Sequence, residues 1–169
     1  MFRWFIERRK ERKRLEELYE FTTSEIHKLQ LSRAKSLFIE LNEKFSEDFW
    51  IGNHSNDNFE GVKDLLPEHL SHFFETYALS DFVCSELVIS SSSIKHSELH
   101  SECICIGEDG FDAEVVILPK KEDIYVLYND DPNTEITAYL KEGAPSIYHF
   151  IIEKLCINDQ IYEYVNQNL

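Results

Sequence analysis

The chain has 169 residues, the length of one ordinary domain. Hydrophobic residues make up 43% and charged residues 29%, with only 5 Gly and 4 Pro, a composition that excludes collagen-like, low-complexity and largely disordered chains. The longest unbroken apolar run, Ile124–Tyr128, is far too short to span a membrane as a helix. No apolar stretch follows the basic first 14 residues, so we expect no secretory signal and a cytoplasmic location.

The net charge of −15 divides into two regions of opposite sign. Residues 1–14 hold seven Lys or Arg against two Glu, a net charge of +5, whereas residues 15–169 carry −20. An acidic body of this size repels nucleic acid and attracts basic partners. We therefore expect a basic protein partner and no nucleic acid.

The first 14 residues combine aromatic and basic side chains, MFRWFI followed by a segment with six cations. This composition is typical of a short anchor that lies in the interface of an anionic membrane. Alternatively, the segment begins a solvated helix whose aromatic residues pack on its own domain or on a second copy. The sequence leaves this choice open, together with the oligomeric state.

The N-terminal third of the chain has the pattern of helices. No Pro or Gly occurs before Gly52, and apolar residues recur every three or four positions. This spacing predicts helices over about 5–30 and 33–47, with Ser32 as a cap or kink between them. We divide the chain into a basic helical extension, residues 1–30, and a single α+β domain, residues 31–169.

The next segments predict a loop and a third helix. Residues 51–64 are rich in Gly, Asn and Asp, which favours a loop. Pro67 then stands where a helix begins, and the apolar spacing that follows it continues to Tyr77.

After Tyr77 the apolar period becomes that of strands. The segments that predict strands are 86–90, 102–107, 112–118, 123–128 and 135–139. Their separators are too short for crossover helices, so we expect a mainly antiparallel twisted sheet of four to five strands. Pro145 begins a helix to about Cys156, and residues 159–166 add another turn or two. The predicted fold class is α+β, with C-terminal helices packed on the sheet.

Neither the cysteines nor the histidines predict a metal or cofactor site. The four cysteines contain no C-x-x-C pair, which favours buried free thiols. The segment EHLSHFFE carries His69 and His72 three residues apart around apolar residues, and we interpret both as surface histidines. No nucleophile–base pair or phosphate-binding glycine loop occurs, so we expect no cofactor and no enzymatic activity.

Two predicted hairpin turns, within 108–114 and 129–135, are dense in carboxylates. They lack the complete D-x-D-x-D-G loop of a calcium site, and solvation of the turns is the simplest interpretation. Because turns project from a sheet, they are also where we expect a protein-binding surface. Its candidate residues are Glu108, Asp109, Asp112, Asp130, Asp131 and Glu135.

Four motifs follow one another between about Phe59 and Cys156. They are Gly61 with Leu66-Pro67-Glu68 before a helix, two strands around Gly107-Glu108-Asp109-Gly110, the strand Asp123-Ile124-Tyr125-Val126, and Ala144-Pro145-Ser146 before Tyr148, Phe150 and Ile151. In their order and spacing the chain resembles the SUKH superfamily, which includes many bacterial immunity proteins and a fungal cell-wall synthesis regulator. The chain departs from the family at Ala78-Leu79-Ser80-Asp81, where Asn-Gly is common, and in its basic N-terminal extension.

The resemblance implies a protein that acts by binding rather than by catalysis. Bacterial members of the superfamily neutralise a cognate toxin, often a nuclease or another polymorphic toxin. We therefore expect an immunity protein that binds a basic toxin such as a nuclease, and a body with a charge of −20 suits such a partner. The alternative is a membrane-peripheral adaptor, or a cell-wall-related regulatory protein, anchored by residues 1–14.

Overall fold

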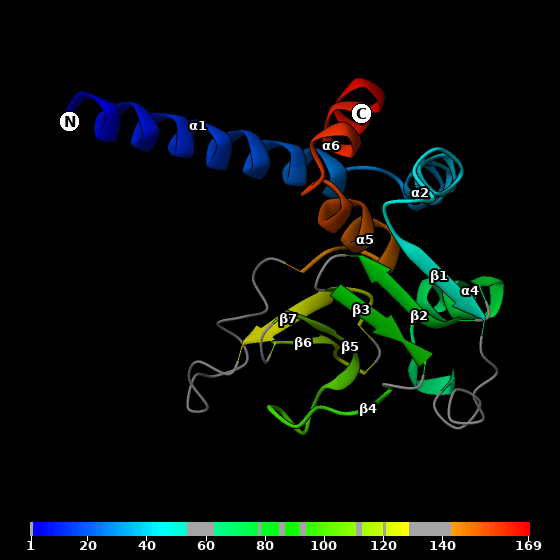
Figure 1. The fold of residues 1–169 in the computed structure, drawn as a ribbon. Helices are drawn as coiled ribbons and strands as arrows, with labels where there is room; N and C mark the ends of the chain where they lie inside the picture. The colour runs from blue at the N-terminus through cyan, green and yellow to red at the C-terminus, as the bar shows by residue number, and fades with distance from the viewer. Residues whose placement is uncertain are drawn as a thin grey trace.

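The protein consists of an antiparallel sheet with helices packed on one of its faces (Figure 1). The computed structural model describes residues 2–53, 63–77, 79–84, 87–91, 94–110, 113–119, 121–128 and 143–169, and of these only the backbone for 2–12, 15, 50–53, 79–84 and 128. The order of elements is helices, strands and then helices, with a third helix between the first two strands. The predicted α+β class is confirmed.

Two helices begin the chain, as the apolar spacing predicts. Helix α1 runs Phe2–His27 and helix α2 runs Leu31–Lys44. The break between them lies at residues 28–30, and the N-cap of α2 is Gln30, not Ser32. Helix α2 buries Ala34, Leu37, Phe38 and Leu41, which lie on one side of the helix because they are three or four residues apart.

The last turns of α1 belong to the core of the domain. Thr22 and Ile26 are buried, and Ile26 joins the main apolar cluster. The imidazole Nε2 of His27 lies 3.0 Å from the carboxylate Oε2 of Glu153. The division of the chain at residue 30 stays a prediction. The last turns of α1 nevertheless already pack in the core of the domain.

The described residues form a sheet of seven strands, and all the pairings among them are antiparallel. The order is β1-β2-β3-β5-β6-β7, and β4 pairs with β5. The strands are β1 (Trp50–Asn53), β2 (Leu79–Cys84), β3 (Leu87–Ser90), β4 (Lys95–His96), β5 (Ile104–Asp109), β6 (Ala113–Ile117) and β7 (Ile124–Tyr128). Strands β3, β5, β6 and β7 match four of the predicted segments, whereas 135–139 lies outside the described residues.

The strand β1 corrects the prediction of a loop that begins at residue 51. Its residues Trp50 and Ile51 pair with Val83 and Phe82 of β2, a strand that the sequence analysis did not assign. The two strands are joined by a connection that contains helix α4 and are therefore far apart in sequence. Their pairing depends on long-range contact, which a local pattern of Gly, Asn and Asp does not report.

Helix α4, Glu68–Tyr77, begins directly after Pro67, as predicted, and follows the short 3-10 helix η1, Lys63–Leu65. It buries Leu70, Phe73 and Phe74. The ring of Phe73 contacts those of Phe38 in α2 and Tyr148, with centroids 5.9 and 5.6 Å apart. These aromatic contacts join α4 to both the N-terminal and the C-terminal helices.

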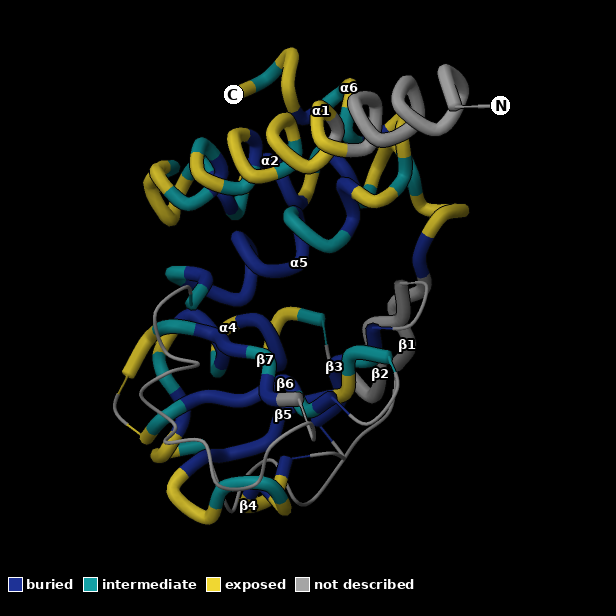
Figure 2. Tube along the Cα trace, turned by 90° about the vertical axis from the view of Figure 1, so that its left-hand side faces the viewer, coloured by how far each residue is buried: buried dark blue, intermediate teal, exposed yellow. Residues whose placement is uncertain are grey.

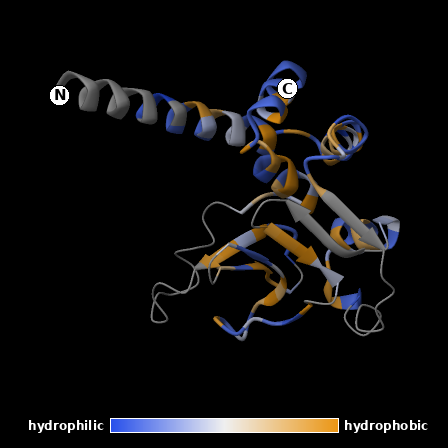
Figure 3. Ribbon diagram, in the orientation of Figure 1, coloured by the Kyte–Doolittle hydropathy of each residue, from blue (hydrophilic) through white to orange (hydrophobic). Residues whose placement is uncertain are grey.

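Helix α5, Ile147–Leu155, is the central helix of the fold. Seven of its nine residues are buried, whereas α2 buries only the residues on one side. Figure 2 shows α5 between the outer helices and the sheet, and Figure 3 shows its apolar colouring beside that of the central strands. The helix is preceded by Ser146 as N-cap and so begins two residues after Pro145.

Helix α6, Asp159–Asn168, ends the chain and packs against the N-terminal helices. The hydroxyl of Thr22 donates to the side-chain oxygen of Asn166 at 3.0 Å, and the hydroxyl of Tyr164 donates to Glu40 at 3.1 Å. The side chain of its N-cap, Asn158, accepts hydrogen bonds from two backbone N–H groups of the first turn. Helix α6 therefore adds an outer layer above α5.

Two buried histidines satisfy polar backbone groups around the start of α5. His69 of α4 donates from Nε2 to the carbonyl of Glu122 at 2.7 Å, and its Nδ1 accepts the backbone N–H of Ile147 at 3.3 Å. His149 donates from Nε2 to the carbonyl of Leu29 at 3.0 Å. The interpretation of His69 as a surface residue is therefore wrong, because it supplies an acceptor that a buried helix start requires.

We predict that the domain loses stability as the pH falls below about 6.5. Burial lowers the pKa of His69 and of His149 from the ordinary value of 6.5, so in mild acid the unfolded chain binds more protons than the folded chain. The contribution of these two histidines to the free energy of unfolding is complete above their pKa in the unfolded chain. It is lost as the pH falls towards their lower pKa in the folded chain. The urea midpoint between about pH 7.5 and pH 5.5 measures it.

The matched variants are His69→Gln and His96→Gln. His69→Gln keeps a donor and an acceptor but removes the titrating group, so we expect a weaker pH dependence. His96 is exposed, and its replacement should leave the dependence unchanged. If the urea midpoints of both variants change equally with pH, His69 does not couple folding to protonation.

Candidate functional site

The face of the sheet that lies away from α4 and α5, here called the outer face, has a small apolar cluster of its own. The cluster comprises Cys103, Cys105, Val116, Tyr125 and Leu127, all buried. The alternate residues of the same strands, among them Ile104, Ile106, Val115 and Ile117, join the helices in the main cluster. Both faces of the central strands are thus apolar near their middle, and polar residues gather towards one end of β5 and β6.

A bulge in β5 decides which side of the sheet each acidic residue occupies. The register with β6 shifts between Cys105 and Gly107, so Gly107 pairs with Val115 and Glu108 pairs with Glu114. A Cβ atom at Gly107 would lie 2.1 Å from the carbonyl oxygen of Val88, closer than any side chain permits. The close approach of β3 therefore requires glycine at this position.

Glu108 and Asp109 consequently lie on opposite faces of the sheet. Glu108 is exposed and pairs with Val88 and Glu114, whereas Asp109 pairs with Leu87, a residue of the main core. Successive residues of a strand alternate between faces. The two described residues of the predicted binding surface thus do not form one surface.

Asp109 forms an ion pair with Lys154 of α5. Its carboxylate Oδ2 lies 2.5 Å from the ammonium Nζ, and both side chains are 17% exposed. The same ammonium lies 5.4 Å from the centre of the Phe150 ring. Asp109 is the last residue of β5 and is not a solvated turn tip, so it holds the central helix against the sheet.

Four glutamates are linked to the outer face, and we call them the acidic outer face: Glu98, Glu102, Glu108 and Glu114. Glu108 pairs with Glu114, the backbone N–H of Glu98 donates to Glu114, and the charge of Glu102 acts on the thiol of Cys103. Glu108 and Glu114 are directly opposite on neighbouring strands. Two like charges in that position destabilise a strand pair. The contacts of the described residues therefore give no folding reason for an acid at the exposed position Glu108.

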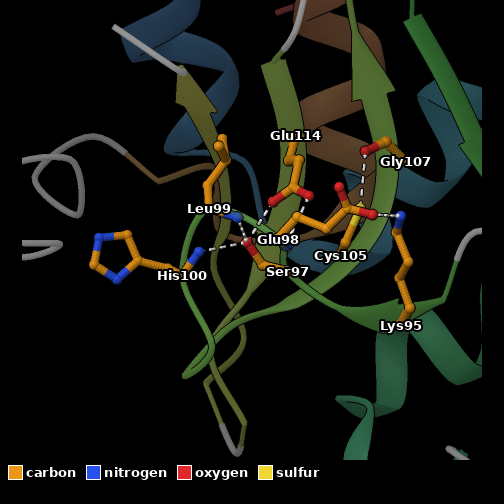
Figure 4. A network of polar contacts seen from close by, with 8 residues as sticks. All are labelled: Lys95, Ser97, Glu98, Leu99, His100, Cys105, Gly107 and Glu114. Carbon is orange, nitrogen blue, oxygen red and sulfur yellow. Dashed lines mark hydrogen bonds and ion pairs between the residues drawn. The ribbon is translucent and has the colours of Figure 1, made fainter. Parts of the chain in front are cut away.

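Glu114 also fixes the turn that covers the outer cluster (Figure 4). The hydroxyl of Ser97 donates to one of its carboxylate oxygens, and the backbone N–H of Glu98 donates to the other at 3.0 Å. The same hydroxyl oxygen accepts the N–H groups of Leu99 and His100 at 3.1 and 2.9 Å. Glu114 is thus a structural anchor, while Glu98 pairs with Lys95 at 2.5 Å.

The thiols beneath this surface are poor nucleophiles. Burial, together with the charges of Glu102 and Glu114, raises the pKa of Cys103 to about 11. Burial also raises the pKa of Cys105, whose thiol donates to the carbonyl of Gly107 at 3.3 Å. Reactive cysteines require the opposite environment. Cys103, Cys105 and Cys156 are free and buried, as the sequence predicts.

The structure describes two of the six predicted binding residues, Glu108 and Asp109, and separates them. Asp112, Asp130, Asp131 and Glu135 lie outside the described residues. Sequence reasoning missed Glu114 as the cross-strand neighbour of Glu108, and Glu98 as the residue whose backbone N–H bonds to Glu114. The sequence shows Glu114 only as one acid in an otherwise apolar strand, and the register of β5 with β6 supplies its place beside Glu108.

Within the described part of the chain, no group of three His, Cys, Asp or Glu side chains is arranged to hold a metal ion. None of the described helices is both long enough and apolar enough to cross a membrane. Comparison of the chain with protein-family models, with curated proteins and with solved structures gave no match. The resemblance to the SUKH superfamily thus rests on the quoted motifs and stays a prediction.

The neighbours Glu108 and Asp109 should differ sharply when each loses its charge. Asp109→Asn leaves the ammonium of Lys154 partly buried without a carboxylate, and we expect a loss of about 1–3 kcal/mol in the free energy of unfolding. Glu108→Gln, at an exposed position, should change it by less than about 0.5 kcal/mol. Urea denaturation of the two isosteric variants measures the difference. Similar effects would contradict the assignment of the two residues to opposite faces.

Proposed function

We propose that this chain is a non-catalytic binding module of the cytoplasm that captures a basic protein through the acidic outer face. Following the resemblance to the SUKH superfamily, the proposed partner is a cognate bacterial toxin, such as a basic nuclease, which the chain neutralises as an immunity protein. The observation that carries the proposal is the exposed Glu108, which lies directly opposite the like charge of Glu114 and has no stabilising partner among the described residues.

The charge distribution supports a basic partner. Residues 15–169 carry a net charge of −20, and the acidic outer face places Glu108 and Glu114 opposite each other on the strands that carry the small apolar cluster. Among the described residues, Lys95 is the cation that forms an ion pair with a glutamate of the acidic outer face, Glu98. Because opposite charges accelerate encounter over about one Debye length, such a surface favours fast capture of a basic protein.

Residues of the acidic outer face differ in their suitability for binding. Glu98 and Glu114 take part in hydrogen bonds or ion pairs that hold the 97–103 turn. Glu102 and Glu108 are exposed. We therefore assign direct charge contact with the partner to Glu102 and Glu108, and a supporting role to Glu114.

The test begins with a search of the neighbouring reading frames for a toxin-like domain, which then serves as the partner. Co-expression of the chain should protect cells from that domain. In the Glu102→Gln, Glu108→Gln variant, association at low salt should slow by roughly two- to fivefold, with a weaker salt dependence and a nearly unchanged dissociation rate. Stopped-flow measurements at two salt concentrations give these rates.

The matched control is Glu43→Gln, Glu47→Gln, which removes two exposed charges at the end of α2 and beyond it. It changes the net charge equally but leaves the outer face intact, so we expect a smaller effect on association. Equal slowing by both variants would show that net charge alone steers the partner. Failure of co-expression to protect would exclude the neighbouring toxin as the partner.

The second candidate is a membrane-peripheral adaptor, or a cell-wall-related regulatory protein, anchored by residues 1–14. The observation that favours it is the course of α1, whose N-terminal part extends away from the body and is not folded back on the domain (Figure 1). An accessible segment with a net charge of +5 and aromatic residues is able to meet an anionic surface.

Deletion of residues 1–14 tests this second candidate. The truncated chain should keep a cooperative thermal transition, because the described buried side chains begin at Thr22. Anionic vesicles at low salt should retain the full chain and release the truncated one if the segment is an anchor. Equal co-sedimentation of the two chains would exclude the anchor, and loss of the transition would show that the segment is part of the fold.

A further inference from the structure

Helix α1 extends beyond the surface that holds it. The helix has 26 residues, which corresponds to a length of about 39 Å. Its contacts with the body lie near its C-terminal end, where Thr22 bonds to Asn166 and His27 to Glu153. Figure 1 shows the N-terminal half projecting away from the other elements. Because α1 is one continuous helix, its N-terminal half does not turn back to pack on the body of its own chain.

The part of α1 next to the body exposes two large apolar side chains. Leu18 is 41% exposed and Phe21 is 63% exposed. They are three residues apart and therefore neighbours on the helix surface. A single exposed apolar side chain requires no explanation, but Leu18 and Phe21 together form a small apolar surface where the projecting helix leaves the body.

The charge of α1 changes sign at the middle of the helix. Residues 2–14 contain seven Lys or Arg and two Glu, whereas residues 15–27 contain four Glu and no Lys or Arg. The boundary between the two halves coincides with the midpoint of Phe2–His27. Two such helices side by side in parallel would align like charges. In antiparallel orientation, each basic half lies along the acidic half of the other.

We propose that two copies of this chain form a dimer through antiparallel pairing of α1, related by a two-fold axis near residues 14 and 15. The basic half of each helix covers the surface around Leu18 and Phe21 of its partner. The contact is self-complementary, so it closes at two copies and does not propagate into a filament. The pair buries apolar surface and neutralises the charge that each half carries alone.

The experiment is a charge exchange in the full chain, read by sedimentation equilibrium. Wild type should be dimeric at low ionic strength (about 0.02 M) and should dissociate at about 0.5 M salt. Arg8→Glu, Arg9→Glu lowers the net charge of residues 2–14 from +5 to +1, and Glu17→Lys, Glu20→Lys raises that of residues 15–27 from −4 to 0. Each should weaken self-association at least about tenfold, and a mixture of the two should form a one-to-one heterodimer.

The control is Glu43→Lys, Glu47→Lys, which reverses as many charges outside α1 and should leave the dimer intact. Circular dichroism of each variant verifies that the exposed substitutions leave the fold unchanged. A monomeric wild type at low salt overturns the proposal, and so does a dimer that ignores both charge reversals. A wild type that stays monomeric but binds anionic vesicles overturns it in favour of the membrane anchor.

Discussion

The structure depends on the burial of one short helix between two layers. Helix α5 is covered on nearly every side, by α1, α2 and α4 and by the sheet. Burial of a helix this apolar is favourable, but its first backbone N–H groups lose water and have no partner within the helix. His69 supplies an acceptor for Ile147, and His149 links the same helix to the carbonyl of Leu29. The core thus depends on two neutral imidazoles at a place where apolar side chains would leave polar groups unsatisfied.

A second constraint lies in the sheet, at the bulge next to Gly107. One extra residue in β5 changes the alternation of faces, so Asp109 meets Lys154 of α5 while Glu108 faces outward. Without the bulge, Asp109 would face outward and Glu108 would face α5. The carboxylate next to Lys154 would then belong to the longer glutamate side chain. The backbone approach of Val88 admits only glycine there, which ties the position of both acids to one residue.

The described carboxylates have two kinds of surroundings. Where carboxylates lie at seams between elements they are paired, as Asp109 is with Lys154, Glu40 with Arg33, and Glu153 with His27. The hydrogen bond from Arg33 and those from the hydroxyl groups lower the pKa of Glu40, although burial opposes them. On the outer face the two kinds of carboxylate lie side by side, because Glu114 holds the 97–103 turn while its neighbour Glu108 is exposed.

The sequence by itself determined the helices and most of the central strands. The three-to-four spacing of apolar residues placed α1, α2, α4 and α5, and the Ile- and Val-rich segments placed β3, β5, β6 and β7, because these patterns follow from local geometry. It also determined the opposite charges of the two halves of α1. Only the tertiary structure decided the pairing of β1 with β2, the burial of His69 and the separation of Glu108 from Asp109. Each depends on residues distant in sequence, as Asp109 and Lys154 are by 45 positions, and a local pattern records that a residue is buried or charged but not which residue it meets.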